Sequence, residues 1–294
     1  MIGIDWGTSS FRAFRLDRAG RVLARRAAPR GILACEEGHF AQELLRQVGD
    51  WIADGETSVL LSGMIGSRQG WVEAPYLPCP AGPSEIAAAL VPIPFEGATL
   101  RLVPGLTHSD ASGTPEVMRG EETQIVGVLP RLGEEGIACL PGSHSKWARV
   151  AGGRITAYRT YLSGEAFAAL RGGTILGRMM KDGPTDPAAF ARGVARSGDP
   201  GHLLHHLFGV RTLGLFGRLG ETEAASYLSG LLIGHEVRAA LPPGGTVHLI
   251  GAASLCALYA GAIAACGGTA VSHDEDTAAR GLARIAEENA WEAT

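Results

Sequence analysis

Two short turns of small, hydroxyl-bearing residues are the part of this 294-residue sequence best suited to chemistry. The first, Gly7-Thr8-Ser9-Ser10, follows an apolar stretch that carries one acidic residue, Asp5. The second, Gly142-Ser143-His144-Ser145, follows another apolar stretch and precedes Lys146. Backbone N–H groups and hydroxyls in such turns can hold phosphate oxygens, because no bulky side chain stands in the way. Together the two turns could bind one triphosphate.

Asp5 is an unexpected neighbour for a phosphate, because its carboxylate would repel a bare phosphate group. Its position at the edge of the first turn therefore favours a hydrated Mg²⁺ between the two, with Asp5 binding the metal through water. The alternative is a β-hairpin whose aspartate caps its own turn. Arg12, in the following strand, would either neutralise a transferring phosphoryl group or lie solvated on the strand.

Two further segments carry groups that a nucleotide site would use. The acidic pair Glu121-Glu122 follows a glycine at the expected start of a helix. Because neighbouring helical residues point about 100° apart, one carboxylate should face the site, and the other should be solvated or interact with the helix N-terminus. The small residues Gly251 and Ala252, between a strand and a helix, could lie against an adenine ring or form a tightly packed junction.

The elements that position these residues follow from hydrophobic periodicity. The first part of the chain predicts strands at 1–4, 11–16 and 21–27, a helix at 39–54 and a strand at 58–61. Residues 63–98 are rich in Gly and Pro and predict a structured loop suited to binding. A similar strand-turn-strand entry recurs later, with a strand from 99, a helix at 121–130, strands at 137–140, 146–150, 154–160 and 247–250, and a helix at 255–265. The sequence therefore predicts a duplicated α/β architecture.

Length and composition add limits on the class of protein. A chain of 294 residues exceeds what one compact core usually holds, so we expect two lobes, at 1–98 and 99–294. The net charge of −4, with scattered Lys and Arg, argues against a nucleic-acid partner. The sequence has no apolar run of the roughly 18 residues that a membrane span needs, which predicts a cytoplasmic protein that does not bind membranes. It also lacks a P-loop motif and a dinucleotide-binding GxGxxG after a strand.

The order of these parts resembles that of the actin, hsp70 and sugar-kinase superfamily. Three stretches are more specific, namely LSGMIGSRQGW at 61–71, VMRGEETQ at 117–124 and LPGSHSKW at 140–147. They closely resemble the 2-dehydro-3-deoxygalactonokinase family, and the likeness extends over essentially the whole chain. The resemblance implies two ribonuclease H-like (actin-like ATPase) lobes with a nucleotide cleft between them, and ATP and Mg²⁺ as cofactors.

The resemblance also implies an activity and roles for residues. The enzyme would transfer phosphate from ATP to the 6-hydroxyl of 2-dehydro-3-deoxy-D-galactonate in galactonate catabolism. Glu121 would be the catalytic base, although larger relatives have Asp at this position. Arg68 and Gln69 would bind the carboxylate of the sugar acid. Trp71 would pack on the sugar carbons or only anchor its loop.

Alternatives remain open at this point. One is a kinase of another small sugar acid or of a ketose, because stereochemistry at one carbon depends on one or two hydrogen bonds that no motif specifies. Another is a non-catalytic, nucleotide-gated sugar sensor. In each case the expected partners are small molecules, ATP and a sugar. The sequence leaves the oligomeric state open, a homodimer included.

Overall fold

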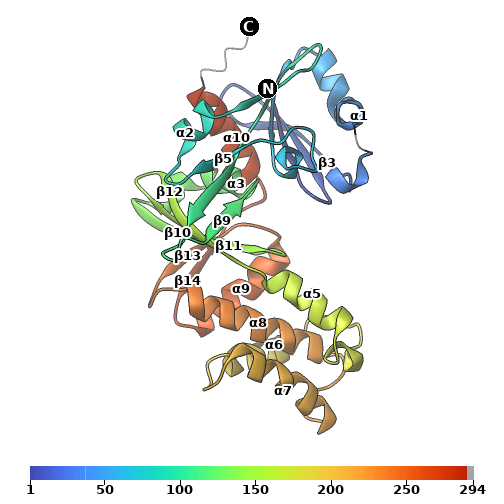
Figure 1. Cartoon of the computed structure of the whole chain (residues 1–294), viewed down its shortest axis with the longest axis vertical. Coiled ribbons are helices and arrows are strands. Elements are labelled where there is room, and N and C mark those ends of the chain that lie inside the picture. Colours follow the sequence, from blue (N-terminus) through green and yellow to red (C-terminus); the bar gives the residue numbers. More distant parts are fainter. Residues whose placement is uncertain (37, 290–294) are drawn as a thin grey trace. The chain divides into compact units, whose positions relative to one another are not determined.

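The computed structural model describes residues 1–36 and 38–289 and divides into two compact units (Figure 1). Unit 1 contains residues 1–135, 148–158 and the stretch from 274, and unit 2 contains residues 136–147 and 159–273. This division differs from the expected one at residue 98. The reason is that β7 (Thr99–Leu102) pairs with β4 (Ser58–Ser62) and so belongs to the first sheet.

The first sheet has six strands in the order β3-β2-β1-β4-β7-β6. Strand β1 is antiparallel to β2 and parallel to β4, which confirms the predicted meander, helix and return strand. The elements that complete this part are β1 (Ile2–Trp6), β2 (Phe11–Leu16), β3 (Val22–Ala28), α1 (Phe40–Ala53) and β6 (Val91–Ile93).

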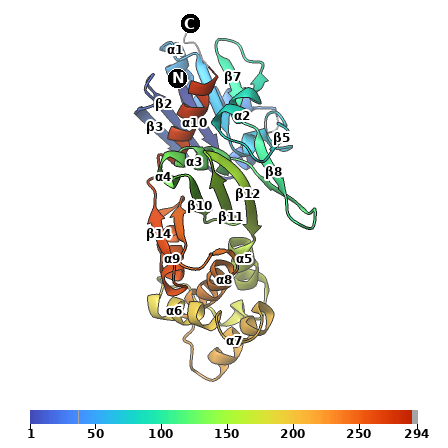
Figure 2. The same ribbon diagram turned by 90° about the vertical axis from the view of Figure 1, so that its left-hand side faces the viewer.

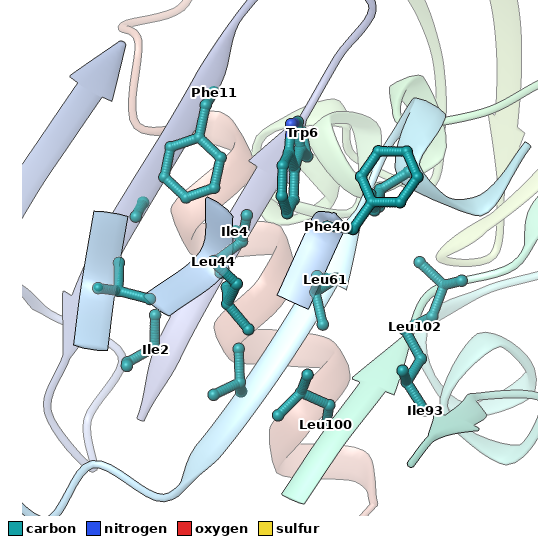
Figure 3. Packing of buried hydrophobic residues seen from close by; sticks show 14 of the residues in the cluster. Ile2, Ile4, Trp6, Phe11, Phe40, Leu44, Leu61, Ile93, Leu100 and Leu102 are labelled. Atoms are coloured by element: carbon teal, nitrogen blue, oxygen red, sulfur yellow. The ribbon is translucent and has the colours of Figure 1, made fainter. Parts of the chain in front are cut away.

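Strand β1 is buried on both faces. Ile2, Ile4 and Trp6 point to one face and pack with Phe40 and Leu44 of α1 in the main core of unit 1 (Figure 3). Such alternation is expected of a strand, because successive side chains point to opposite faces.

The opposite face of β1 packs on α10 (Thr277–Glu288), which Figure 2 shows in red beside α3. Gly3 lies on this face, and a Cβ there would be 2.9 Å from Cδ1 of Leu282. The helix can therefore lie close to the strand only because residue 3 has no side chain. Asp5 is two residues further along and lies on the same face.

The remaining elements of unit 1 correct two expectations. The segment 63–98 is not only a loop, since it contains a 3₁₀ helix (Met64–Gly66), β5 (Tyr76–Pro78), α2 (Pro83–Ala88) and β6. The helix expected at 121–130 is two helices, α3 (Glu121–Val126) and α4 (Leu129–Leu132). Gly127 and Val128 lie between them, and the backbone of Gly127 lies so close to α10 that a Cβ would be 2.0 Å from the carbonyl oxygen of Thr277. A small sheet of three strands, in the order β5-β8-β9, includes β8 (Gly105–Ser109) and β9 (Pro115–Met118).

A second sheet of five strands has the order β12-β11-β10-β13-β14. Its strands are β10 (Glu135–Leu140), β11 (Ser145–Ala151), β12 (Arg154–Tyr161), β13 (Thr246–Leu249) and β14 (Thr269–Ser272). Strands β10, β13 and β14 are parallel, as β1, β4 and β7 are in the first sheet. The order β3-β2-β1-β4-β7 is therefore repeated, which confirms the predicted duplication.

Unit 2 also contains five α-helices between Ser163 and Ala265 and a short 3₁₀ helix at Gly177–Met179. The α-helices are α5 (Ser163–Gly173), α6 (Pro187–Arg196), α7 (Leu203–Leu215), α8 (Ala224–Ala240) and α9 (Ala253–Ala265). Among the described residues, none of the helices has the length and hydropathy that a membrane span needs.

Candidate active site

Asp5 lies near the carboxyl end of β1, where it is paired in register with Arg12 of β2 on one side and Ser62 of β4 on the other. The residue is only 8% exposed, and its Oδ2 forms an ion pair with Nη2 of Arg12. Parallel α/β sheets bind ligands at the carboxyl ends of their strands. Asp5 is therefore a buried but charge-compensated carboxylate at an edge suited to ligands.

Backbone hydrogen bonds fix the turn after β1. The N–H of Gly7 donates to the carbonyl of Ser10 at 2.9 Å, and the carbonyls of Gly7 and Thr8 accept from Ile32 and Leu33 at 3.0 and 3.2 Å. Thr8, Ser9 and Ser10 are exposed. The backbone is thus fixed while the hydroxyl side chains are open to a ligand.

The acidic pair divides into two different environments. Glu122 is fully buried, and its two carboxylate oxygens accept the N–H of Gly120 at 3.0 and 2.7 Å. Burial, together with the neighbouring charge of Glu121, raises the pKa of Glu122 to about 8. Glu121 is half-buried and accepts the N–H of Arg119 at 3.0 Å. The sequence left the second carboxylate either in solvent or at the helix N-terminus. In the structure Glu122 is buried and bonds to the N–H of Gly120 at the start of α3.

Two glycines with positive φ bring these parts of unit 1 together. Gly63 (φ 97°) follows β4, and Gly120 (φ 101°) precedes α3. A Cβ on Gly120 would be 3.1 Å from Cα of Gly63, and a Cβ on Gly63 would be 3.3 Å from Oδ1 of Asp5. The end of β4 therefore lies against the end of β1 on one side and the start of α3 on the other, and glycine at both positions permits this close approach.

In unit 2 the second turn lies against the start of α5. The N–H of Glu165 donates to the carbonyl of Ser143 at 3.0 Å, and its carboxylate pairs with Nε2 of His144. Gly164 permits this approach, because a Cβ there would be 2.4 Å from the carbonyl oxygen of Gly142. The ammonium of the buried Lys146 donates to the carbonyl of His144 at 3.1 Å.

A buried polar network supports the same turn from inside unit 2. The hydroxyls of Ser145 and Tyr259 are 2.7 Å apart, and Tyr259 donates to Oε2 of Glu236 at 2.8 Å. The indole N–H of Trp147 donates to Oε1 of Glu236 at 2.7 Å. Burial raises the pKa of Glu236, which is 3% exposed. One carboxylate on α8 thereby links β11 to α9.

A cavity of about 440 Å³ opens beside this turn. Gly142 and Ser143 line one part, and Leu255, Leu258 and Tyr259 of α9 line another. Side chains and backbone of Ser163, Gly164, Phe167, Arg171, Gly183, Pro184, Thr185, Thr222, Ala225, Ser226, Ser229, Leu232 and Ile233 complete the wall. Its size and its mixture of apolar groups and hydroxyls suit part of a small organic ligand.

The family model for 2-keto-3-deoxy-galactonokinase matches residues 5–285. The chain belongs to this family. The match includes both turns, the acidic pair and the cavity, so every part of the candidate site lies inside the region that defines the 2-keto-3-deoxy-galactonokinases.

Individual relatives agree with the family model. A Rhizobium meliloti (strain 1021) protein, named as a probable 2-dehydro-3-deoxygalactonokinase, DgoK1, is 36% identical over 98% of this chain and 96% of its own length. The 2-dehydro-3-deoxygalactonokinase of Escherichia coli (strain K12) is 33% identical over 93% of each chain. A crystal structure of a protein from Sinorhizobium meliloti superimposes with a TM-score of 0.88 at 34% identity, covering 97% of this chain and 98% of the other. The predicted family and the predicted actin-like α/β fold class are confirmed.

The residues predicted to bind the acceptor in this 2-keto-3-deoxy-galactonokinase family member lie on the loop after β4. The side chain of Arg68 is 87% exposed, with its Nε 3.7 Å from a carboxylate oxygen of Glu73, and Gln69 is exposed. Trp71 packs against the main core of unit 1 and meets Phe95 edge-on, with ring centroids 6.1 Å apart. This packing favours Trp71 as a loop anchor, while the roles of Arg68 and Gln69 stay predictions.

The expected adenine contact at Gly251 and Ala252 also stays a prediction. Gly251 has a φ of 149°, and a Cβ there would be 3.5 Å from the carbonyl oxygen of Pro141. Ala252 is exposed and immediately precedes α9. The cavity wall itself is formed by Leu255 and Leu258, one turn further along the helix.

The structure adds residues that the sequence did not indicate. Glu165 and Glu236 act on the second turn from helices 20 or more residues away in sequence, as shown by their bonds to His144 and Trp147. Glu236 is the single acidic residue in the apolar stretch LSGLLIGHEV. Because a glutamate is seldom buried without a partner, this pattern could have predicted a buried hydrogen-bond network at Glu236.

The residues in unit 1 fit a nucleotide-associated magnesium ion. Among residues 1–36 and 38–289 there is no cluster of three or more His, Cys, Asp or Glu that could form a metal site made by protein alone. Mg²⁺ at nucleotide sites commonly takes one or two carboxylates, keeps several waters and binds the phosphates. Asp5, buried at the edge of an exposed hydroxyl turn, meets that requirement.

Proposed function

We propose that this protein is an ATP-dependent kinase that phosphorylates the 6-hydroxyl of 2-dehydro-3-deoxy-D-galactonate. The observation that carries the proposal is the family match over residues 5–285, which includes the arrangement of Asp5, the hydroxyl turn and Glu121. The two relatives named for this activity cover 93% or more of the chain.

Phosphoryl transfer requires positioning, charge neutralisation and a group that orients or deprotonates the attacking hydroxyl. Glu121 is suited to the last task, because it is half-buried at the start of α3 while Glu122 is occupied by the N–H of Gly120. It would accept the proton of the 6-hydroxyl as that oxygen attacks the γ-phosphorus.

Neutral Glu122 assists this assignment. With a pKa of about 8, Glu122 is mostly protonated at neutral pH, so the site does not hold two adjacent negative charges. Environments that separate the protonation states of two neighbouring carboxyl groups are typical of acid–base sites. Glu121 is then the member of the pair that serves as base.

The phosphates and the nucleoside would be bound by other groups. Thr8, Ser9 and Ser10 offer hydroxyls in unit 1, and the turn from Gly142 to Lys146 offers hydroxyls and an ammonium group in unit 2. The cavity beside α9 would hold part of the nucleoside. When bound, Mg²⁺ would neutralise charge on the phosphate oxygens, and Asp5 would hold it through water.

The test is sugar-dependent ADP formation with a panel of 2-keto-3-deoxy acids and simple ketoses. We expect 2-dehydro-3-deoxy-D-galactonate to be used with the highest kcat/KM and the phosphate to appear on C6 by ³¹P NMR. Preference for a ketose would replace the proposed acceptor with a neutral sugar. Nucleotide binding with no sugar-dependent ADP formation would favour the sensor instead.

A further inference from the structure

A buried arginine beside Glu121 has no acceptor for most of its N–H bonds. Arg119 is 8% exposed, and its Nη2 donates to the carbonyl of Ala74 at 2.7 Å. Its Nε and Nη1 are buried and have no hydrogen-bond partner among the residues that the structure describes. Since Nε carries one N–H bond and Nη1 carries two, three of the five guanidinium donors are unused.

Such a group is unusual in a folded protein. The large majority of buried side-chain polar atoms in proteins have a hydrogen-bond partner, and a buried charge without a counterion is costly. No described carboxylate hydrogen-bonds to this guanidinium, since its one bonded nitrogen is used by Ala74. Within the described part of the chain, the guanidinium of Arg119 therefore keeps the capacity to bind an anion.

The guanidinium of Arg119 lies beside Gly66 and Tyr76, and the residue after Gly66 also has an unused hydroxyl. A Cβ on Gly66 would be 2.9 Å from Nη1 of Arg119, so the absence of a side chain there makes room for the guanidinium. Ser67, the next residue, has a buried Oγ that also has no hydrogen-bond partner in the described part of the chain. The ring of Tyr76 covers the guanidinium, with Cζ 4.5 Å from the ring centroid, and Tyr76 is 42% exposed. The guanidinium of Arg119 thus lies behind a side chain that solvent reaches.

We propose that Arg119, assisted by Ser67, binds the carboxylate of the sugar-acid substrate, and that Tyr76 covers this contact. The proposal rests on the proposed function, and it names the group that selects an acid over a neutral sugar. A guanidinium suits this task, because its planar donors match the geometry of a carboxylate.

Chain length supports the assignment. The backbone N–H of Arg119 donates to Oε2 of Glu121 at 3.0 Å, so the base lies beside the main chain of this arginine. Five bonds join Cα to Cζ in arginine, and five bonds join C1 to C6 in the acid. Each chain reaches roughly 6 Å when extended, given C–C bonds of about 1.5 Å. An acid whose 6-hydroxyl meets Glu121 can therefore bring its carboxylate to the guanidinium.

Arg68 is the rival for the same role. Its side chain is 87% exposed, so it would lose much conformational freedom and hydration on binding a carboxylate. Arg119 is already fixed by Ala74 and Tyr76. A preorganised group binds its ligand at lower entropic cost.

The experiment compares Arg119→Gln, Arg119→Lys and Arg68→Ala with the unaltered enzyme, and uses Arg21→Gln as a matched control on an exposed arginine of unit 1. Each variant is assayed with the sugar acid and with its C1 amide, and its ATP affinity and melting temperature are measured. We expect Arg119→Gln to lower kcat/KM for the acid about 10- to 100-fold, with ATP affinity and use of the amide nearly unchanged. Arg119→Lys should lie between, because it keeps the charge but not the planar donors.

Three results would overturn the proposal. If Arg68→Ala selectively lowers kcat/KM for the acid and Arg119→Gln does not, Arg68 binds the substrate carboxylate. An equal loss of acid and amide would make Arg119 structural, and weaker ATP binding would make it a phosphate ligand. If Arg119→Gln does not fold, Arg119→Lys and Ser67→Ala give the same comparison. Turnover of the acid by the unaltered enzyme tests the proposed function separately, since only the variants test Arg119.

Discussion

The buried carboxyl group of Glu122 should make the protein less stable as the pH rises. Its pKa is about 8 in the folded state, against 4.5 for an ordinary glutamate. Below pH 4.5 the carboxyl group is mostly protonated in both the folded and the unfolded state, so its titration does not change the free energy of unfolding. Between pH 4.5 and 8 the unfolded chain releases this proton while the folded chain keeps it, so the free energy of unfolding falls. The difference between the two pKa values corresponds to roughly 5 kcal/mol, at about 1.4 kcal/mol per pH unit.

Glu122→Gln isolates this effect. The amide has nearly the same shape and can accept the N–H of Gly120, but it cannot ionise. We therefore expect the stability of the variant, relative to the unaltered protein, to rise by about 1.4 kcal/mol per pH unit between roughly pH 5 and 8. All other titrating groups are common to both proteins and cancel in the difference.

Urea denaturation at pH 5.5, 6.5 and 7.5 measures the difference directly. A stability difference that stays constant over this range would refute the reasoning, because it would mean that Glu122 titrates alike in the folded and unfolded states. Turnover gives a second readout. Glu122→Gln should remain active, since the proposed base is Glu121.

Three further changes test other parts of the site. Glu121→Gln should lower kcat by about 10² or more while ATP binding survives, as expected for loss of a general base, and a mild effect beside a crippled Glu122→Gln would reverse the assignment. Asp5→Asn should raise the Mg²⁺ concentration needed for half-maximal turnover, because a negative charge beside the hydrated ion is lost, and an unchanged requirement would leave Asp5 as a turn residue paired with Arg12. Glu236→Leu leaves the indole N–H of Trp147 without its acceptor and the hydroxyl of Tyr259 with only Ser145, so it should cost roughly 1 to 3 kcal/mol of stability and weaken ATP binding. Glu236→Gln, which keeps one acceptor oxygen, should be milder in both urea denaturation and nucleotide titration.

Local patterns in the sequence were enough for the strands and turns. The alternation in β1 and β2 and the glycine and hydroxyl residues after β1 are short-range signals, and the structure has the hairpin where they occur. The sequence also showed the pair Glu121-Glu122, but it did not show which of the two carboxylates is fully buried. Full burial of Glu122 depends on Ser62 and Thr123 packing around it, and no periodicity encodes that contact.

The predicted elements differ from the observed ones where the local structure depends on contacts with distant parts of the sequence. The predicted helix at 121–130 is interrupted after Val126, at the point where Gly127 lies against Thr277, 150 residues further along the chain. Residues 63–98 form short strands because they pair with β7 and β8, which lie later in the sequence. In the sequence Arg119 is one residue of the motif VMRGEETQ, and its unused donors follow only from the positions of Gly66 and Ala74 in the structure.

The contact between Gly3 and Leu282 has a consequence for how the chain folds during synthesis. Unit 1 needs residues from both ends of the sequence, because α10 covers the face of β1 on which Gly3 lies. The residues of unit 2 end at 273, so all of them are synthesised before α10. On a nascent chain β1 would then finish packing only after α10 has been made, and the face of β1 that carries Gly3 would stay open to chaperones and proteases until that point.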